Sequence, residues 1–363
     1  MVSSVKGIKR SMKENKVSMS KEPNMKLVLL LLFIGSIISI ILAIGIGPVS
    51  VHPGTVAKII MSKLPYVTDF IFPTWTRLDE NIVWNLRLPR VLLGMLVGAS
   101  LAVTGVAMQA LVRNHLADPF ILGVSSGASA TATLGMLFGV FSFFGTYALS
   151  ISAFIGAAAT IMIVYTISRV RGRINITQLL LSGVAVAMIM DAVTNVITLS
   201  APNALGLHNA AFWMSGSLAG AKWGYLTLPL VVILFCMSIL LIQYRALNAL
   251  LLGEEAAGTL GTDVKRVQKI LVLVASLLAG TTIAVSGSIG FIGLMVPHIT
   301  RLLIGSDHKK VLPVSALLGG IFVIWTDVVA RIVIAPEELP IGLLTAIIGG
   351  PFFIWLLKRN SRA

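Results

Sequence analysis

Two aspartates lie inside long apolar segments of the sequence. Asp191 is the only charged residue of 179–200, whereas Asp327 precedes Arg331 by four residues within 312–332. A carboxylate at such a position is a functional candidate, because burying its charge in lipid is costly. Asp327 and Arg331 are spaced for an ion pair on one helical face, and Asp191 and Asn195 can face a polar cavity. One candidate function is therefore an ion-gradient-driven secondary transporter that uses Asp191 or Asp327.

Residue patterns typical of catalysis, metal binding or nucleotide binding are absent from the sequence. The histidines are scattered without the spacing of metal ligands, at positions 52, 115, 208, 298 and 308. The phosphate-binding pattern G-x-x-x-x-G-K-[ST] does not occur. We therefore expect that the chain is not an enzyme and binds no metal or cofactor. If ATP and Mg drive the process, another chain binds them.

The composition favours a protein that crosses a membrane many times. Apolar residues make up 56% of the chain and charged residues 12%, against roughly 25% charged residues in soluble domains. The apolar runs do not alternate as barrel strands do, so helices of about 20 residues are expected. We predict an all-α polytopic membrane protein with a single membrane domain over 27–357. The predicted spans, about ten, are 27–47, 91–112, 121–141, 147–168, 179–200, 224–243, 270–286, 291–304, 312–332 and 341–357.

The basic residues predict the orientation of these spans. Residues 1–26 and 358–363 form basic tails, and placing both in the cytoplasm puts most of the 28 Lys and Arg residues on that side. The net charge of +14 then reflects this bias and contact with anionic lipid, and we expect no nucleic-acid partner. Residues 48–86 become the first outer loop, with an amphipathic run near 56–64.

The cytoplasmic segment 245–269 is too apolar for a solvated linker and too short to cross the membrane. Glu254 and Glu255 are placed to begin a short helix, where carboxylates complement the positive end of the helix dipole. Gly258 and Gly261 are placed to close it. This helix can dock a soluble partner or lie on the lipid surface. The candidate coupling residues are Gly253, Glu254, Glu255, Ala256, Ala257, Gly258 and Gly261.

Three arginines fall on the outer side, against the positive-inside bias. Arg87 and Arg90 lie at the outer end of the second span, and Arg331 lies near the outer end of the ninth. They can extend toward lipid headgroups, or they can bind acidic groups of a partner on the outer face.

Several long segments resemble one known family. They are spread over most of the chain after residue 85, at 86–90, 98–128, 253–261, 286–313, 327–331 and 338–357. In these segments the chain is similar to permease subunits of the iron-siderophore, haem and cobalamin (FecCD-type) ABC importers. His115 departs from the family, whose members often carry proline there.

The resemblance implies the type II ABC importer fold and a homodimer with the translocation path between its subunits. It also implies two cytoplasmic ATPase subunits, an extracytoplasmic binding protein and a bacterial plasma membrane. By this resemblance, residues 253–261 contact the ATPase, and Arg87, Arg90 and Arg331 meet glutamates of the binding protein. The fifth span lines the path, with Asn175, Thr177 and Gln178 near its cytoplasmic mouth. A ferric siderophore is the expected cargo, with haem, cobalamin and a small oxyanion left open.

Overall fold

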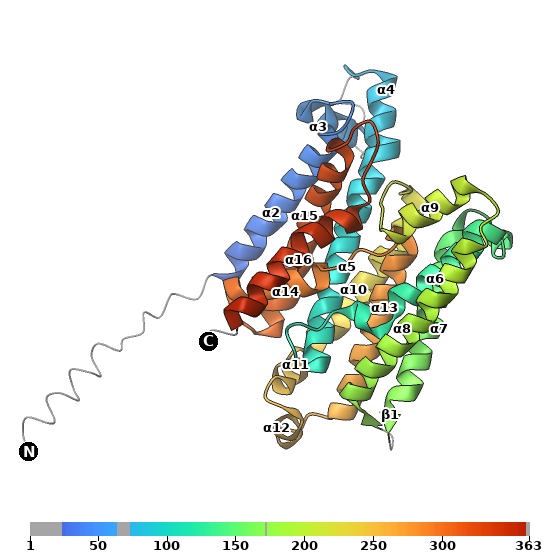
Figure 1. Cartoon of the computed structure of the whole chain (residues 1–363). Coiled ribbons are helices and arrows are strands. Elements are labelled where there is room, and N and C mark those ends of the chain that lie inside the picture. Colours follow the sequence, from blue (N-terminus) through green and yellow to red (C-terminus); the bar gives the residue numbers. More distant parts are fainter. Residues whose placement is uncertain (1–23, 64–72, 171–172, 361–363) are drawn as a thin grey trace, which may run out of the picture.

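A computed structural model describes residues 24–63, 73–170 and 173–360 of the chain (Figure 1). Residues 1–23 of the predicted N-terminal tail, 64–72 of the predicted outer loop and 361–363 of the C-terminal tail lie outside the described residues.

The main helices occur where the apolar runs predict spans. They are α2 (Met25–Gly45), α5 (Leu88–Val112), α6 (Val124–Phe138), α7 (Ala148–Ser168), α8 (Ile176–Leu199), α10 (Thr227–Ile242), α13 (Val264–Ser286), α14 (Ile292–Ile304), α15 (His308–Ile332) and α16 (Ile341–Asn360). Among the described residues, eight of these helices are long and apolar enough to cross a membrane. The other two, α6 and α14, have 15 and 13 residues. The prediction of an all-α polytopic membrane protein is confirmed.

Shorter elements connect these helices. They are α3 (Pro53–Ser62), α4 (Arg77–Glu80), η2 (Asn81–Arg87), η3 (Pro119–Leu122), η4 (Ser142–Tyr147), β1 (Arg169–Val170), β2 (Arg173–Ile174), α9 (Ala204–Met214), η5 (Trp223–Tyr225), α11 (Tyr244–Leu250) and α12 (Glu254–Thr259). The strands β1 and β2 pair as a small antiparallel hairpin between α7 and α8. We name the two ends of the bundle after α3 and α12, which lie at opposite ends (Figure 1).

Two helices begin earlier in the chain than the predicted spans, because capping residues start them inside polar segments. Helical backbone begins at Arg77 within the predicted loop 48–86, since Thr76 and Asp79 form a capping box, and it then runs through α4 and η2 into α5. The seventh helix, α13, begins at Val264 and not near 270, because the Asp263 carboxylate accepts a hydrogen bond from the backbone N–H of Arg266. Side-chain caps satisfy the free N–H groups of a first turn even where its residues are polar.

The helix α5 runs through the centre of the bundle and contacts α13, α14 and α15 (Figure 1). Nearly all of its residues are buried, and glycines bring its backbone close to its neighbours. A Cβ atom added to Gly98 would lie 2.1 Å from the carbonyl oxygen of Gly319 on α15. One added to Gly105 would lie 1.8 Å from the carbonyl oxygen of Gly293 on α14. Small residues allow this packing where no hydrophobic drive joins helices.

Two chain interruptions meet inside the bundle. Residues 287–291 separate α13 from α14, with Gly287 at φ 65°, as the glycines of this stretch predict. Residues 113–123 separate α5 from α6. The hydroxyl group of Ser288, within the first interruption, and that of Ser125, just after the second, are hydrogen-bonded at 2.7 Å.

Candidate functional site: the surface around α12 and a buried arginine cluster

The segment predicted to couple to a partner forms the short helix α12 between α11 and α13. Gly253 precedes it with φ 103° and Gly261 follows it with φ 80°, and this left-handed conformation favours glycine. At its C-terminal end, the N–H of Gly261 donates to Gly258 O and the N–H of Thr262 donates to Ala257 O, both at 3.0 Å. This pair of bonds is a Schellman motif. The sequence therefore correctly places both ends of the helix.

Ala257 anchors α12 to the rest of the protein. Its side chain is fully buried in the hydrophobic cluster that includes α5 and α13, whereas Glu254, Glu255 and Gly258 are exposed. Ala257 is thus the buried side chain of a six-residue helix whose other side chains are exposed or partly exposed.

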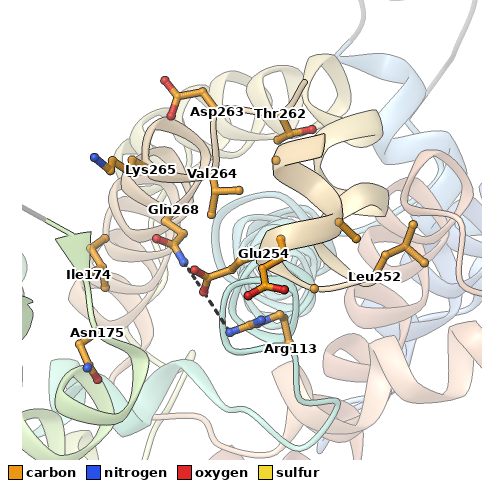
Figure 2. Close-up of a pocket in the computed structure, with 14 residues that line it drawn as sticks. Arg113, Ile174, Asn175, Leu252, Glu254, Thr262, Asp263, Val264, Lys265 and Gln268 are labelled. Carbon is orange, nitrogen blue, oxygen red and sulfur yellow. Dashed lines mark hydrogen bonds and ion pairs between the residues drawn. The ribbon is translucent and has the colours of Figure 1, made fainter. Parts of the chain in front are cut away.

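A cavity of about 1500 Å³ opens beside α12. Figure 2 shows its walls, which come from the end of α5, the start of α8, the α11–α12 turn and the first turns of α13. Five of the predicted coupling residues line the cavity, namely Gly253, Glu254, Glu255, Ala256 and Gly258. Asn175 lines it as well. The structure thus joins the coupling segment to the predicted mouth of the path.

Glu254 and Glu255 have different surroundings. The Glu254 Oε1 atom accepts hydrogen bonds from Arg113 Nη2 at 3.0 Å and from Gln268 Nε2 at 3.2 Å (Figure 2). Glu255 lines the same cavity and has no hydrogen bond or ion pair within the described part of the chain. One carboxylate is therefore bonded to two other side chains of the protein, and the other makes no such bond within the described residues.

The predicted path residues lie along the exposed side of α8. Asn175 caps the helix by accepting a hydrogen bond from the N–H of Gln178 at 3.0 Å. Thr177, Gln178, Asp191 and Asn195 are exposed on the isolated chain. Because 13 residues of helix span about 20 Å, Gln178 and Asp191 are well separated and do not form one cluster.

The arginine cluster at the α3 end is internal. Arg90 Nη2 lies 2.8 Å from Asp327 Oδ1, and Arg90 Nη1 lies 2.9 Å from Glu338 Oε2. Arg331 Nε lies 3.1 Å from Asp327 Oδ2, so the ion pair predicted from the four-residue spacing is confirmed. Asp327 is 1% exposed, and two guanidinium groups neutralise it.

Arg87 and Arg331 also cap the last turn of α2. Arg87 Nη1 donates to Ile44 O at 2.8 Å and its Nη2 donates to Val49 O, while Arg331 Nη2 donates to Ala43 O at 3.0 Å. Cations at a helix C-terminus satisfy its free carbonyl groups and complement its dipole.

The three arginines are buried, at 7%, 8% and 2% exposure for Arg87, Arg90 and Arg331. Their role in docking a binding protein stays a prediction, and the hydrogen bonds found here give them a structural role within the chain.

Three polar residues of this architecture were not singled out by the sequence. Arg113 and Gln268 hold Glu254, and Gln109 joins α5 to α14. The sequence could have indicated Arg113 as a partner of Glu254, because Arg113 follows a predicted span and carries the opposite charge. Gln109 and Gln268 carry no comparable pattern. Within the described residues, no group of three or more His, Cys, Asp or Glu side chains could hold a metal ion.

Comparison with known proteins identifies the family. The sequence model of the FecCD transport family matches residues 32–359. The hemin transport system permease protein HmuU of Yersinia pestis is 42% identical over 275 residues, 74% of this chain and 82% of HmuU. The cobalamin import system permease protein BtuC of Halobacterium salinarum is 42% identical over 264 residues, 73% of this chain and 70% of BtuC.

A solved structure of an inward-facing metal-chelate type ABC transporter shares the fold. It superposes with a TM-score of 0.79 at 30% identity and covers 92% of this chain and 99% of the solved chain. The chain therefore belongs to the FecCD transport family, as a multi-pass permease subunit of an ABC importer that is not itself an enzyme.

Proposed function

We propose that this chain forms the translocation path for a ferric siderophore or a related metal chelate, such as haem or cobalamin. The observation that carries this proposal is α12, a short helix at one end of a membrane bundle with accessible glutamates beside a large cavity. A separate ATPase subunit, which binds ATP and Mg, docks on this surface. Movement of α12 on ATP binding then rocks the helices around the path.

A second copy of the chain completes the path. The exposed side of α8 combines large apolar residues, among them Leu181 and Met188, with the polar side chains of Asp191 and Asn195. A purely lipid-facing surface would not carry an exposed carboxylate at membrane depth. A homodimer that brings two α8 helices together places these groups on a shared polar passage.

The α12 end faces the cytoplasm, and the α3 end receives an extracytoplasmic binding protein. The first residues of α2 and the last residues of α16 lie toward the α12 end (Figure 1), so both termini are cytoplasmic in a bacterial plasma membrane. This orientation also places Arg169, Lys265 and Arg266 on the cytoplasmic side, in accord with the positive-inside bias.

The choice of cargo follows from the relatives. Besides the hemin and cobalamin permeases, the iron(3+)-hydroxamate permease FhuG of Bacillus subtilis is 37% identical over 279 residues. Metal chelates are the chemical class that these relatives share.

The test is uptake of a ferric hydroxamate siderophore labelled with radioactive iron, with haem and cobalamin as parallel probes. The chain is reconstituted in vesicles with its cognate ATPase and binding protein. Uptake that requires ATP and the binding protein supports the proposal. Uptake that follows a proton gradient without ATP, and is lost on Asp191→Asn, would instead establish the ion-driven alternative.

A further inference from the structure

The two neighbouring glutamates of α12 are held differently, because Arg113 and Gln268 bond to only one of them. Glu254 is bonded to Arg113 and Gln268, whereas the adjacent Glu255 has no such bond within the described residues. Figure 2 shows the Arg113 side chain directed at Glu254 across the mouth of the cavity. The coupling helix is therefore linked by one ion pair to the end of α5.

The backbone at Arg113 is suited to this contact. Arg113 is the C-cap of α5 and has φ 55°, a left-handed conformation that few residues other than glycine adopt. Helical geometry ends there, and the chain turns toward Ala117 and η3. The guanidinium group thus sits at the last position of a helix whose first turn carries Arg90, which is bonded to Asp327 on α15.

The rest of the attachment of α12 is loose. Gly253 and Gly261 flank the helix, and an added Cβ atom at either position would meet nothing within 4 Å. Ala257 provides one buried apolar contact. A six-residue helix held in this way can rotate locally when a partner pushes on it. Polar links to Glu254 restrict that rotation.

The Arg113–Glu254 pair contributes little to folding stability, since its side chains are 37% and 44% exposed and exposed ion pairs are weak. What it provides is a geometric link between α12 and the central helix α5. Gln268, 3% exposed on α13, adds a second link to the same carboxylate.

We propose that Arg113 is a positioning residue, which ties Glu254 to the end of α5 so that movement of α12 is passed to the helices around the path. This inference rests on the proposed function, in which an ATPase moves α12. It assigns the two glutamates separate roles, with Glu254 as the internal link and Glu255 as the carboxylate left for the ATPase.

The test measures the amount of ferric siderophore imported per ATP hydrolysed in vesicles that contain the complete complex. Arg113→Gln and Glu254→Gln should each lower this ratio about fivefold or more, the lower end of typical coupling between sites, while ATP hydrolysis continues. The double charge exchange Arg113→Glu with Glu254→Arg should recover much of the ratio. Arg113→Lys, which keeps the charge but not the planar fork, should fall between wild type and Arg113→Gln.

Two matched variants separate the proposed role from general effects of charge. Arg266→Gln removes an exposed positive charge from the first turn of α13, the helix that carries Gln268, without removing a bond to Glu254. Glu255→Gln removes the neighbouring carboxylate and should weaken ATPase binding, with little change in the ratio for complexes that form.

An unchanged ratio in Arg113→Gln and Glu254→Gln would overturn the inference. Loss of the ATPase from those two variants during purification would also overturn it, by showing a docking role. A wild-type complex without ATP-dependent uptake would overturn the proposed function itself.

Discussion

The side-chain amide of Gln109 donates a hydrogen bond to the carbonyl oxygen of Gly293 at 3.2 Å. Gly293 lacks its usual helical partner because Pro297, four residues later in α14, has no N–H group. The Oε1 atom of the same Gln109 accepts a hydrogen bond from Arg301. One buried glutamine on α5 thus compensates for a proline inside α14 and joins the two helices.

Replacing Gln109 with leucine should destabilise the protein by about 1 to 3 kcal/mol, the cost of leaving buried polar groups unpaired. Both the Gly293 carbonyl and the Arg301 guanidinium lose a partner. Thermal unfolding of the purified protein in detergent measures the change. Gln178→Leu, at an exposed position of α8, is the control and should leave the unfolding temperature nearly unchanged. Equal unfolding temperatures for the two variants would contradict this role of Gln109.

The two aspartates within predicted spans should respond very differently to the same substitution. Asp327→Asn leaves the buried Arg90 and Arg331 with one carboxylate fewer, and breaking a buried ion pair typically costs about 3 to 5 kcal/mol. We expect the free energy of unfolding to fall by about 3 kcal/mol, the lower end of this range, because Arg90 retains its ion pair with Glu338. Asp191→Asn, on the exposed side of α8, should leave stability unchanged. Thermal unfolding of both variants decides between a structural and a purely transport-related role for Asp327.

Close helix packing at Gly98 should make that position intolerant of even one methyl group. Gly98→Ala places a Cβ atom against the Gly319 backbone, and overpacking of this kind costs about 1 to 3 kcal/mol. Gly35 on α2 has open space around an added Cβ, so Gly35→Ala should be neutral or slightly stabilising. If the unfolding temperatures of both variants match that of wild type, α5 and α15 are not packed as described.

Asp118, in the connection between α5 and η3, should make stability depend on pH. Burial raises the pKa of its carboxyl group to about 6, although the carboxylate still accepts a hydrogen bond from the N–H of Phe120 at 2.8 Å. The folded protein therefore holds this proton more tightly than the unfolded chain, so stability falls as pH rises from about 4 to about 6 and is level above that range.

Asp118→Asn keeps an acceptor for the Phe120 N–H and removes the titrating group. Its stability should exceed that of wild type above pH 6, by less than the roughly 3 kcal/mol that two pKa units represent, since the residue is only partly buried. Unfolding temperatures measured between pH 4 and 7.5 test this. Parallel curves for variant and wild type would show that Asp118 does not titrate in this range.

The sequence by itself determined the membrane class, the approximate positions of the helices and the ends of α12. These features depend on local properties: the length of an apolar run, a glycine that permits a left-handed residue, or an acidic first turn. The Asp327–Arg331 pair belongs with them, since four residues on a helix bring two side chains together.

Only the tertiary structure decided which distant groups meet. Arg90 and Asp327 are 237 residues apart and Arg113 and Glu254 are 141 apart, and no local pattern selects one partner over another at such separations. The three arginines that we expected on the outer side are buried, and no local pattern in the sequence indicates this. Their charges are matched by carboxylates and helix-end carbonyls that only the packing of α2, α5 and α15 brings within reach.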